Sequence, residues 1–332
     1  MAFMVTGGAG YIGAHVARLL RERDDVVVVD DLSVGRRERV AGLPIVQLDL
    51  GDSSCVGPLT EAMREHGVRT VVHFAARKQV GESAARPAYY YAQNVGGIAH
   101  LLAAMETAGV KELVFSSSAA TYGAPEGEGA AEGIMREDQR CNPVSPYGET
   151  KLVSEWMCAD AEAAWGLRWL ALRYFNVAGA GWPELGDPAI LNLIPMVLSD
   201  LTNGRRPKVF GKDYETRDGT CERDYVHVLD LAEAHVTSVD QLAREGLADG
   251  ARVVNIGTGQ GSTVLEVMDA VRAATGIDFV PEITGRRAGD PPVLVADVER
   301  AAKVLGWRSR LELPDMVSSA WEAWQLAPPD PQ

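Results

Sequence analysis

The sequence predicts an α/β protein in which a doubly wound parallel sheet of the Rossmann type precedes a smaller C-terminal α/β domain. Three observations support this prediction. An apolar stretch at residues 3–6 leads into a glycine-rich turn, a second at residues 26–29 ends in two aspartates, and further apolar stretches alternate with amphipathic segments. Such alternation is typical of parallel strands joined by helical crossovers. A chain of 332 residues suffices for one large core and a smaller second one.

Residues 1–176 contain the predicted doubly wound sheet. Its strands are short apolar runs, expected at residues 3–6, 26–29, 45–49, 70–74, 113–115 and 169–173. Helices are expected from the glycine-rich turn to about residue 23, over residues 89–108, and over residues 147–165. The Gly-, Ala- and Glu-rich segment 123–142 is predicted to be a loop, which either covers an edge of the functional site or lies plainly on the surface.

Beyond residue 176 the composition shifts toward proline, glycine and isolated charges, which marks a second domain at residues 177–327. Helices are expected there at residues 191–202, 228–243, 263–275 and 314–326. The third begins with Thr263 and Glu266 at the spacing of a capping box. The chain is expected to return to the first sheet around residues 223–256 and to end in a proline-rich tail, residues 328–332.

The glycine-rich turn predicts a dinucleotide site. Gly7, Gly10 and Gly13 recur at every third position between a strand and a helix. Glycine permits a tight turn and a close backbone approach to a pyrophosphate, and the amide groups of the helix N-terminus then face the anion. An acid at the end of the second strand, here Asp30 followed by Asp31, accepts hydrogen bonds from the adenosine ribose and repels a 2′-phosphate. These residues predict NAD, rather than NADP, as the cofactor.

Tyr147 and Lys151 form the candidate catalytic pair. Residues four apart share one face of a helix, and Ser145 followed by Pro146 is a favourable start for that helix. A free tyrosine has a pKa near ~10 and is a poor base at neutral pH. A lysine ammonium one turn away is expected to lower that pKa. The pair therefore predicts a proton acceptor that strips a hydroxyl while hydride leaves the same carbon.

Charge and cysteine content limit the partners of this chain. The formal net charge of −14 argues against nucleic acid or an anionic membrane as a partner. No stretch is apolar enough to span a bilayer, and the first strand begins almost at Met1, so no signal peptide is expected. The four cysteines lack C-x-x-C spacing and the histidines lack paired ligand spacing. We therefore expect a cytoplasmic protein with reduced thiols and no metal site.

Several segments of the chain resemble the UDP-glucose 4-epimerase family of extended short-chain dehydrogenase/reductases. They extend from residue 1 to about residue 324 and read VTGGAGYIG from Val5, VVDDLS from Val28, FAARKQVGES from Phe74, SSSAATYG from Ser116, SPYGETK from Ser145, RYFNVAGA from Arg173, RDYVHVLDLAEAH from Arg223 and RRAGDPP from Arg286. The resemblance implies reversible C4 epimerisation of UDP-hexoses, UDP-glucose and UDP-galactose, through a 4-keto intermediate and tightly bound NAD.

The resemblance also implies roles for individual residues. Ser118, Tyr147 and Lys151 are expected to be catalytic. The residues expected to bind NAD are Gly7, Gly10, Tyr11, Ile12, Gly13, Asp30, Asp31, Asp49, Leu50, Phe74, Ala75, Ala76, Lys78, Asn94, Tyr147, Lys151 and Phe175. The residues expected to bind the UDP-sugar are Lys78, Ser118, Tyr147, Asn176, Asn192, Leu193, Phe210, Arg223, Arg287, Asp290 and Leu294.

A homodimer is the expected assembly. In the resembled family, the helices that correspond to residues 89–108 and 147–165 pair across a two-fold axis. Here both segments carry apolar residues beyond one core face, among them Trp156 and Met157. The other interpretation is that both apolar stripes only pack on the sheet.

Three alternative functions stay open: an epimerase for another UDP-sugar such as UDP-N-acetylglucosamine, a nucleotide-sugar dehydratase of the same fold, and a non-catalytic NAD-sensing regulator. A dehydratase is expected to carry an acid just after the serine, where this chain has residues 119–121, Ala-Ala-Thr. A regulator is expected to lose Ser118 or the Tyr147/Lys151 pair, and all three are present. Leu294 stands where a large aromatic restricts family members to plain hexoses, so weaker turnover of UDP-N-acetylglucosamine is expected beside the main pair.

Overall fold

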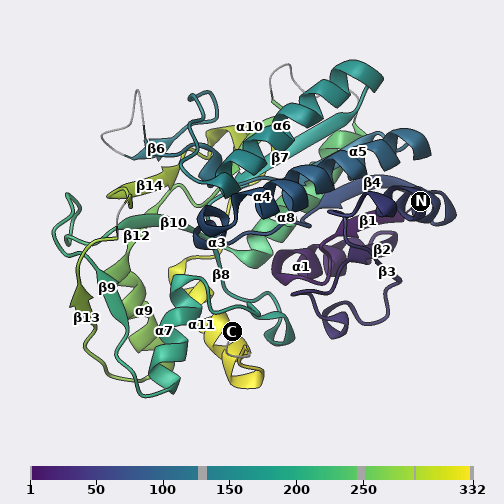
Figure 1. The fold of residues 1–332 in the computed structure, drawn as a ribbon. Helices are drawn as coiled ribbons and strands as arrows, with labels where there is room; N and C mark the ends of the chain where they lie inside the picture. Colours follow the sequence, from purple (N-terminus) through teal and green to yellow (C-terminus); the bar gives the residue numbers. More distant parts are fainter. Residues whose placement is uncertain (1, 126–132, 245–250, 288, 330–332) are drawn as a thin grey trace.

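The computed structural model describes residues 2–125, 133–244, 251–287 and 289–329. Its largest element is a seven-stranded parallel sheet with helices on both faces (Figure 1). In order across the sheet, the strands are β11 (Val253–Ile256), β7 (Arg168–Tyr174), β5 (Glu112–Ser116), β4 (Val68–His73), β1 (Ala2–Thr6), β2 (Asp25–Asp30) and β3 (Ile45–Gln47). The strand order reverses between β1 and β4, which in such sheets puts the ligand crevice outside the carboxyl ends of these strands. The predicted Rossmann-type fold is confirmed.

Two apolar cores lie on the two faces of this sheet. One face is covered by α1 (Tyr11–Leu20), α8 (Val228–Ala243) and α10 (Glu299–Leu305), and the other by α2 (Val56–Glu65), α5 (Gly96–Ala108) and α6 (Pro146–Trp165). Successive side chains of a strand point to opposite faces: Val5 and Val28 belong to the first core, Met4 and Val27 to the second. Burial on both faces explains why these strands are continuous apolar runs.

A smaller second sheet contains most of the C-terminal strands. Its order is β12 (Gly261–Thr263), β10 (Glu222–His227), β14 (Val293–Ala296) and β6 (Ile134–Met135), and β8 (Asn176–Ala178) also pairs with β10. Strands β9 (Lys208–Phe210) and β13 (Glu282–Thr284) form a separate pair. A third core is shared by α7 (Leu193–Thr202), α9 (Val264–Thr275) and α11 (Leu313–Leu326). None of the helices in the described ranges is long and apolar enough to cross a membrane.

The two halves of the chain exchange strands between the sheets. Strand β6, from the N-terminal half, pairs with β14 of the second sheet, and β11, from the C-terminal half, extends the first sheet beside β7. Within residues 223–256, α8 and β11 return to the large sheet, whereas β10 belongs to the second one. The segment 123–142 therefore contains a short strand; its residues 126–132 lie outside the described part of the chain.

The long helix predicted at residues 89–108 is found, but it contains a π-helical turn that was not predicted. The chain forms α4 (Pro87–Tyr90), then a π-helical turn, η3 (Tyr91–Val95), and only then α5. In the wide turn, the buried Asn94 points inward, where its amide hydrogen-bonds the backbone of Arg77. Such turns are frequent at functional sites, and residue periodicity does not reveal them.

Both predicted helix caps are confirmed. Ser145 precedes α6 with Pro146 at its first position, and the serine Oγ accepts a hydrogen bond from the amide of Gly148. Thr263 and Glu266 form the predicted capping box of α9. Several elements were not predicted, among them α2, α10 and the strands of the second sheet, because they are short or lack clear periodicity.

Candidate active site

A cleft of about 510 Å³ lies at the carboxyl edge of the seven-stranded sheet. It is lined by the glycine-rich turn after β1, the two aspartates at the end of β2, the segment after β4, and Tyr147 and Lys151 of α6. A volume in this range is typical of small-molecule and cofactor sites. All the residues expected to bind NAD line this cleft except Asn94 and Phe175.

The glycine-rich turn is shaped for close backbone contact. Gly7 has a left-handed backbone with φ +69°, and a Cβ atom there would lie 2.6 Å from the backbone nitrogen of Ala75. At Gly13 a Cβ would lie 2.3 Å from the carbonyl oxygen of Gly7. A side chain at either position would therefore displace the turn and the N-terminus of α1 from their packed positions. This geometry fits a pyrophosphate held against main-chain amides.

The two aspartates after β2 have different partners. Asp30 is buried, and its two carboxylate oxygens accept hydrogen bonds from the amides of Ala9 and Leu32, each 2.9 Å long. Burial raises the pKa of Asp30 above its ordinary value. Asp31 instead accepts from the amide of Ser33 at 2.9 Å and from a guanidinium nitrogen of Arg77 at 2.7 Å. Each carboxylate oxygen has two acceptor sites, so Asp30 can still accept from a ribose hydroxyl.

Tyr147 and Lys151 line the other end of the cleft, and Ser118, which is not part of the cleft lining, lies beside Tyr147. Ser118 follows β5 and is the N-cap of a short 3-10 turn, and its side chain hydrogen-bonds Tyr147. Lys151 Nζ donates to the backbone carbonyl of Ser116 at 2.7 Å and lies 6.0 Å from the Tyr147 ring centroid. The spacing of four residues thus puts both side chains on the cleft face of α6, as expected.

The expected effect of Lys151 on the pKa of Tyr147 is not found. Burial raises the pKa of the Tyr147 phenol above its ordinary value, and the hydrogen bond with Ser118 offsets only part of that rise. Burial likewise lowers the pKa of Lys151 to about 8. The physical reason is desolvation, which disfavours the charged form of each group. The lysine, moreover, donates to a carbonyl rather than to the phenol.

A buried polar cluster next to Ser118 was not predicted. Ser117 Oγ donates to Glu155 Oε1 at 2.5 Å, and Glu155 forms a two-point ion pair with Arg173 of β7, with nitrogen–oxygen distances of 2.9 and 2.5 Å. Both charged side chains are about 95% buried. The paired hydrogen bonds hold Ser117, and so the backbone of Ser118, against α6. The three residues are distant in sequence, which hides the cluster from pattern analysis.

Asn94 and Phe175 do not line the cleft. The Asn94 amide donates to the carbonyl of Arg77 and to Thr150 Oγ1, and accepts from the Arg77 amide, so it connects the segment after β4 to α6. Phe175 is buried in a small apolar cluster with Ala119 and Leu294 beside it. Both side chains therefore position residues of the site from behind its surface.

The residues expected to bind the UDP-sugar gather in three groups. Arg223 of β10 lies opposite Leu294 of β14 in the sheet register, and its guanidinium is 3.5 Å from the carboxylate of Asp290. The guanidinium carbon of Arg287 lies 3.9 Å from the ring centroid of Phe210. The third group consists of residues spread over several elements: Asn176 begins β8, Asn192 is the N-cap of α7 and Leu193 its first residue, Ser118 is the N-cap of the 3-10 turn after β5, and Lys78 and Tyr147 line the cleft.

Residues 179–192 connect the cofactor cleft to this second region. Their first turn is fixed to α1, because Tyr11 donates to the carbonyl of Gly179 at 2.5 Å and His15 Nε2 accepts from the amide of Gly181 at 3.0 Å. Further along, Pro188, Ala189 and Leu191 line the cleft, and Asn192 donates to Asp187 at 2.8 Å. The segment therefore brings one end of the predicted UDP-sugar site against the cofactor cleft.

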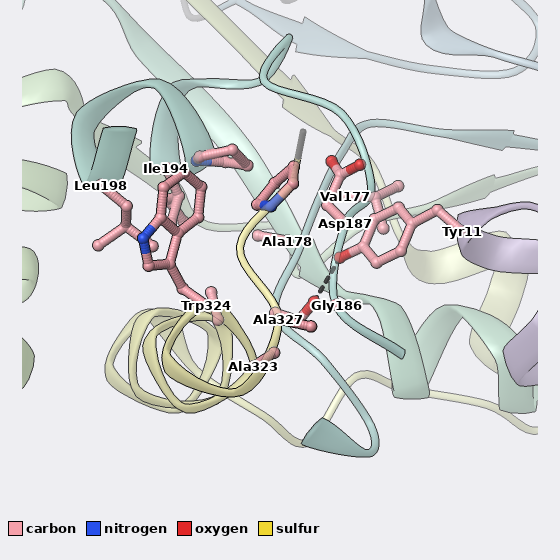
Figure 2. Close-up of a pocket in the computed structure, with 14 residues that line it drawn as sticks. Tyr11, Val177, Ala178, Gly186, Asp187, Ile194, Leu198, Ala323, Trp324 and Ala327 are labelled. Carbon is pink, nitrogen blue, oxygen red and sulfur yellow. Dashed lines mark hydrogen bonds between the residues drawn. The ribbon is translucent and has the colours of Figure 1, made fainter. Parts of the chain in front are cut away.

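Figure 2 shows the small cavity between this segment and the C-terminal helix α11. Tyr11 reaches into it from α1, while Trp324 and Leu198 line it from α11 and α7. Its volume is about 20 Å³, close to the space that one water molecule needs. It is too small for a ligand group, so Tyr11 serves the contact between α1 and residues 179–192.

Sequence analysis missed several residues that line the cleft. They are polar or aromatic and come from the turn after β2, the segment after β4, α3 (Val80–Ala85), α4, the π-helical turn and the end of β7: Ser33, Arg77, Gln79, Glu82, Tyr89, Tyr90, Gln93 and Tyr174. The only signal available was the position of Arg77 next to Lys78, inside a segment already assigned to the cofactor site.

Comparisons with known proteins agree with this geometry. A family model described as the NAD dependent epimerase/dehydratase family matches residues 3–257. A UDP-glucose 4-epimerase of Azospirillum brasilense is 43% identical over 97% of this chain and 91% of its own length. The crystal structure of a Brucella ovis UDP-glucose 4-epimerase in complex with NAD is 41% identical, with a TM-score of 0.89, and covers 96% of this chain and 97% of its own.

A Bifidobacterium longum UDP-glucose 4-epimerase, solved in complex with NAD+ and UDP, is 35% identical with a TM-score of 0.86 and covers 99% of both chains. The similarity thus includes both the large sheet and the second region. The chain belongs to the NAD dependent epimerase/dehydratase family and, within it, to the UDP-glucose 4-epimerases.

Proposed function

We propose that this protein interconverts UDP-glucose and UDP-galactose by inverting the sugar carbon C4 while NAD stays bound. The observation that supports this most directly is the meeting of Ser118, Tyr147 and Lys151 at one end of a dinucleotide-sized cleft. A sugar hydroxyl held there lies next to Tyr147, whose phenolate form can take the hydroxyl proton. Bound NAD supplies the nicotinamide ring that accepts the C4 hydride and returns it to the opposite face of the sugar.

Each catalytic side chain has one task in this reaction. Tyr147 takes the proton of the C4 hydroxyl and gives it back when the 4-keto sugar is reduced. Ser118, which hydrogen-bonds Tyr147, contacts the same sugar oxygen, so the proton moves only between neighbouring oxygen atoms. Tyr147 has to be a phenolate before it can take this proton, and Lys151, held by the Ser116 carbonyl, stabilises that phenolate with its positive charge. Because the lysine pKa is lowered only to about 8, most of the side chain remains charged at neutral pH.

The substrate has to be held at its nucleotide and left free at its sugar. The keto sugar must present both faces to the same reactive carbon, so a rigid grip on the hexose would block the second half of the reaction. Arg223, Arg287 and Phe210 supply two guanidinium groups and an aromatic ring for a diphosphate and a base. Leu294, next to Arg223 in the sheet register, offers the sugar an apolar wall without a hydrogen bond.

Two alternatives are less well supported. Elimination of water from the sugar requires an acid close to the catalytic serine, but Ser118 is followed by the 3-10 turn Ala119–Thr121, whose only polar side chain, Thr121, donates to the Ser118 carbonyl. A non-catalytic NAD sensor has no need of a phenol, an ammonium and a hydroxyl brought together. An epimerase that also accepts UDP-N-acetylglucosamine remains compatible with Leu294.

We further propose which part of the chain binds each ligand and where in the cell the enzyme acts. Residues 1–176 bind NAD, and residues 177–327 mainly bind the UDP-sugar. The protein acts in the cytoplasm, where its four cysteines, all free, would remain reduced.

It works as a homodimer through the outer face of α6 and the π-helical turn, where Trp156 is 59% and Tyr91 37% exposed. Exposed aromatic side chains of this size are frequent at protein interfaces.

Product analysis tests the proposal. The purified protein is incubated with UDP-glucose, UDP-galactose or their N-acetyl forms without added cofactor, and the nucleotide sugars are separated by chromatography. We expect interconversion of the first pair, and close to one NAD per chain released on denaturation. A dehydrated sugar product, or NADP in place of NAD, would contradict the assignment.

A further inference from the structure

Four side chains form a bridge across the cofactor cleft: Arg77, Asp31, Ser33 and Gln93. Arg77 Nη2 donates to Asp31 Oδ2 at 2.7 Å and to Gln93 Oε1 at 3.2 Å, and Arg77 Nη1 donates to Ser33 Oγ at 2.5 Å. All four residues line the cleft. We call this set the clasp.

The strand order shows what the clasp spans. Arg77 follows β4, whereas Asp31 and Ser33 follow β2, and β1 lies between these two strands. Neighbouring strands are about 4.8 Å apart, so the guanidinium reaches over the end of β1, where the glycine-rich turn begins. Leu48 and Asp49 line the cleft on the β2 side of the clasp, and Tyr147 lines it on the β4 side. A ligand that fills the whole cleft therefore passes the clasp near its middle.

Both ends of the clasp are preset by the fold. The backbone of Arg77 is held by two hydrogen bonds to the buried Asn94, 2.8 and 3.0 Å long. On the other side, Leu32 adopts a left-handed backbone with φ +58°, which a leucine rarely does. This turn lets Asp31 Oδ1 accept from both the amide and the hydroxyl of Ser33. With both backbones fixed, the clasp opens by rotation of the Arg77 side chain alone.

The ion pair within the clasp is partly shielded from water. The Arg77 side chain is 21% and the Asp31 side chain 26% exposed. Hydrogen bonds to Ser33 and the charge of Arg77 hold the pKa of Asp31 below its ordinary value, against the effect of burial. The Arg77 guanidinium also lies 5.9 Å from the ring centroid of Tyr89, another cleft residue. A partly buried, multiply bonded pair of this kind is stronger than a solvent-exposed one.

We propose that the clasp is a gate that retains NAD: it must open for the cofactor to leave, and it slows exchange during the many turnovers of a redox-neutral reaction. This inference rests on the proposed function, because only a reaction that regenerates its own cofactor benefits from such retention. In the described part of the chain, none of the hydrogen bonds of the four clasp residues is with Tyr147 or Lys151, so the clasp is expected to act on cofactor exchange and not on proton transfer.

The test measures NAD exchange in the holoenzyme. Purified protein with its bound NAD is mixed with an excess of a fluorescent etheno-NAD analogue, and the exchange rate is followed for the wild type, Arg77→Leu, Asp31→Asn and the double variant. Each single variant is expected to exchange NAD about tenfold faster. The double variant is expected to be no faster than the singles, because either change opens the same bridge.

Arg86→Leu is the matched control. Arg86 stacks on the same Tyr89 ring, 4.0 Å from its centroid, but pairs with Glu82 on its own side of the cleft and makes no contact across it. Its exchange rate should equal that of the wild type. If Arg77→Leu does not fold, the salt dependence of exchange in the wild type and in Asp31→Asn takes its place: 1 M salt should accelerate only the wild type, since screening weakens the ion pair.

The possible results distinguish a failure of the proposed gate from a failure of the proposed function. Unchanged exchange in both single variants overturns the gate. So does an additive, hundredfold acceleration in the double variant, which would mean that the two side chains contact NAD independently. A wild-type protein that interconverts the UDP-sugars without bound NAD overturns the proposed function and the gate together. Accelerated, non-additive exchange in the two single variants and the double variant supports the gate.

Discussion

At the residue scale, burial shifts the two ionisable groups that we propose as catalytic, Tyr147 and Lys151, toward their neutral forms. The pKa of the Tyr147 phenol is raised and that of Lys151 lowered to about 8, and desolvation is the largest cause in both. Loss of water disfavours the charged form of each group when it stands alone, but a phenolate and an ammonium in the same pocket stabilise each other. The site therefore favours transfer of a proton between well-placed partners over a permanently ionised base.

Tyr147→Phe removes the proton acceptor without removing the ring. We expect turnover to fall about 10²–10⁴-fold, the usual contribution of a positioned acid–base group, with NAD still bound. Turnover of UDP-galactose and the NAD content of the purified protein are the two measurements. Tyr91→Phe is the control. The Tyr91 phenol donates to Glu149 of α6, the helix that also contains Tyr147, but Tyr91 does not line the cleft. Near-native turnover in Tyr147→Phe would refute the mechanism.

Leu294→Tyr tests which sugars the pocket accepts. Leu294 packs near Ala119 and Phe175, next to the catalytic serine segment, so a larger ring there would narrow the space around the hexose. We expect any turnover of UDP-N-acetylglucosamine to be lost while UDP-galactose turnover changes little, since steric exclusion acts on the bulkier substrate. Leu294→Met, which conserves volume, should preserve both activities. Equal losses on both substrates would argue against this role.

At the element scale, the contact between α1 and residues 179–192 joins the cofactor cleft to the UDP-sugar region. His15 is fully buried in this contact: Nδ1 bonds the Tyr11 carbonyl at 2.9 Å, Nε2 accepts from the Gly181 amide, and the ring packs on Trp182. Because Nε2 must accept, the imidazole has to be neutral. Burial accordingly lowers the pKa of His15 to about 3.

This contact should make the protein sensitive to acid. The folded pKa of His15 lies below its unfolded value of about 6.5, so the unfolded chain binds the proton more tightly. The stability that neutral His15 contributes is present above pH 6.5 and is lost as the pH falls toward 3. Buried His73 and His235, with pKa values lowered to about 3 and 4, act in the same direction.

His15→Gln isolates one part of this effect. Glutamine can donate and accept at the same site but does not titrate. Urea unfolding at pH 4.5, 5.5 and 6.5 should show a free energy of unfolding that falls less steeply in the variant, by up to about 1.4 kcal/mol per pH unit, the value for one proton. Above pH 7 both proteins should respond alike. Identical slopes at acid pH would show that His15 does not titrate during unfolding.

At the scale of the whole molecule, two sheets share strands from both halves of the chain, and one helical face is left uncovered. Strands β6 and β11 cross between the halves, so the cofactor and substrate regions fold as interdependent units. On the outer side, Trp156 of α6 is 59% exposed beside a hollow that Tyr91 and Val153 also line. This face is the surface that we expect a second copy to cover.

Light scattering at micromolar concentration should give twice the chain mass for the wild type. Trp156→Glu should give a monomer, because a buried charge without a partner would disfavour the interface. Val280→Glu is the matched control: Val280 is 71% exposed outside this face, so the variant should remain dimeric. A monomeric wild type would contradict the homodimer.

The sequence alone predicted the large sheet and the cofactor end of the site. Those features are local: Gly7, Gly10 and Gly13 fall within one strand–turn–helix unit, and Tyr147 and Lys151 within one helical turn. Strands such as the one at residues 26–29 could be recognised as continuous apolar runs, because the sheet is buried on both faces. The residues expected to bind the UDP-sugar came instead from resemblance to a family, since nothing local distinguishes a phosphate-binding arginine from a structural one.

Only the tertiary structure decided how distant residues act on one another. It turned the helix at residues 91–95 into a π-helical turn, joined Glu155 to Arg173 behind the serine, and reversed the expected shift in the pKa of Tyr147. It also placed Arg77, which follows β4, next to Asp31, which follows β2. Local patterns specify which groups are present, but burial and contact across the sheet determine their charge and their partners, and both depend on the packing of the whole chain.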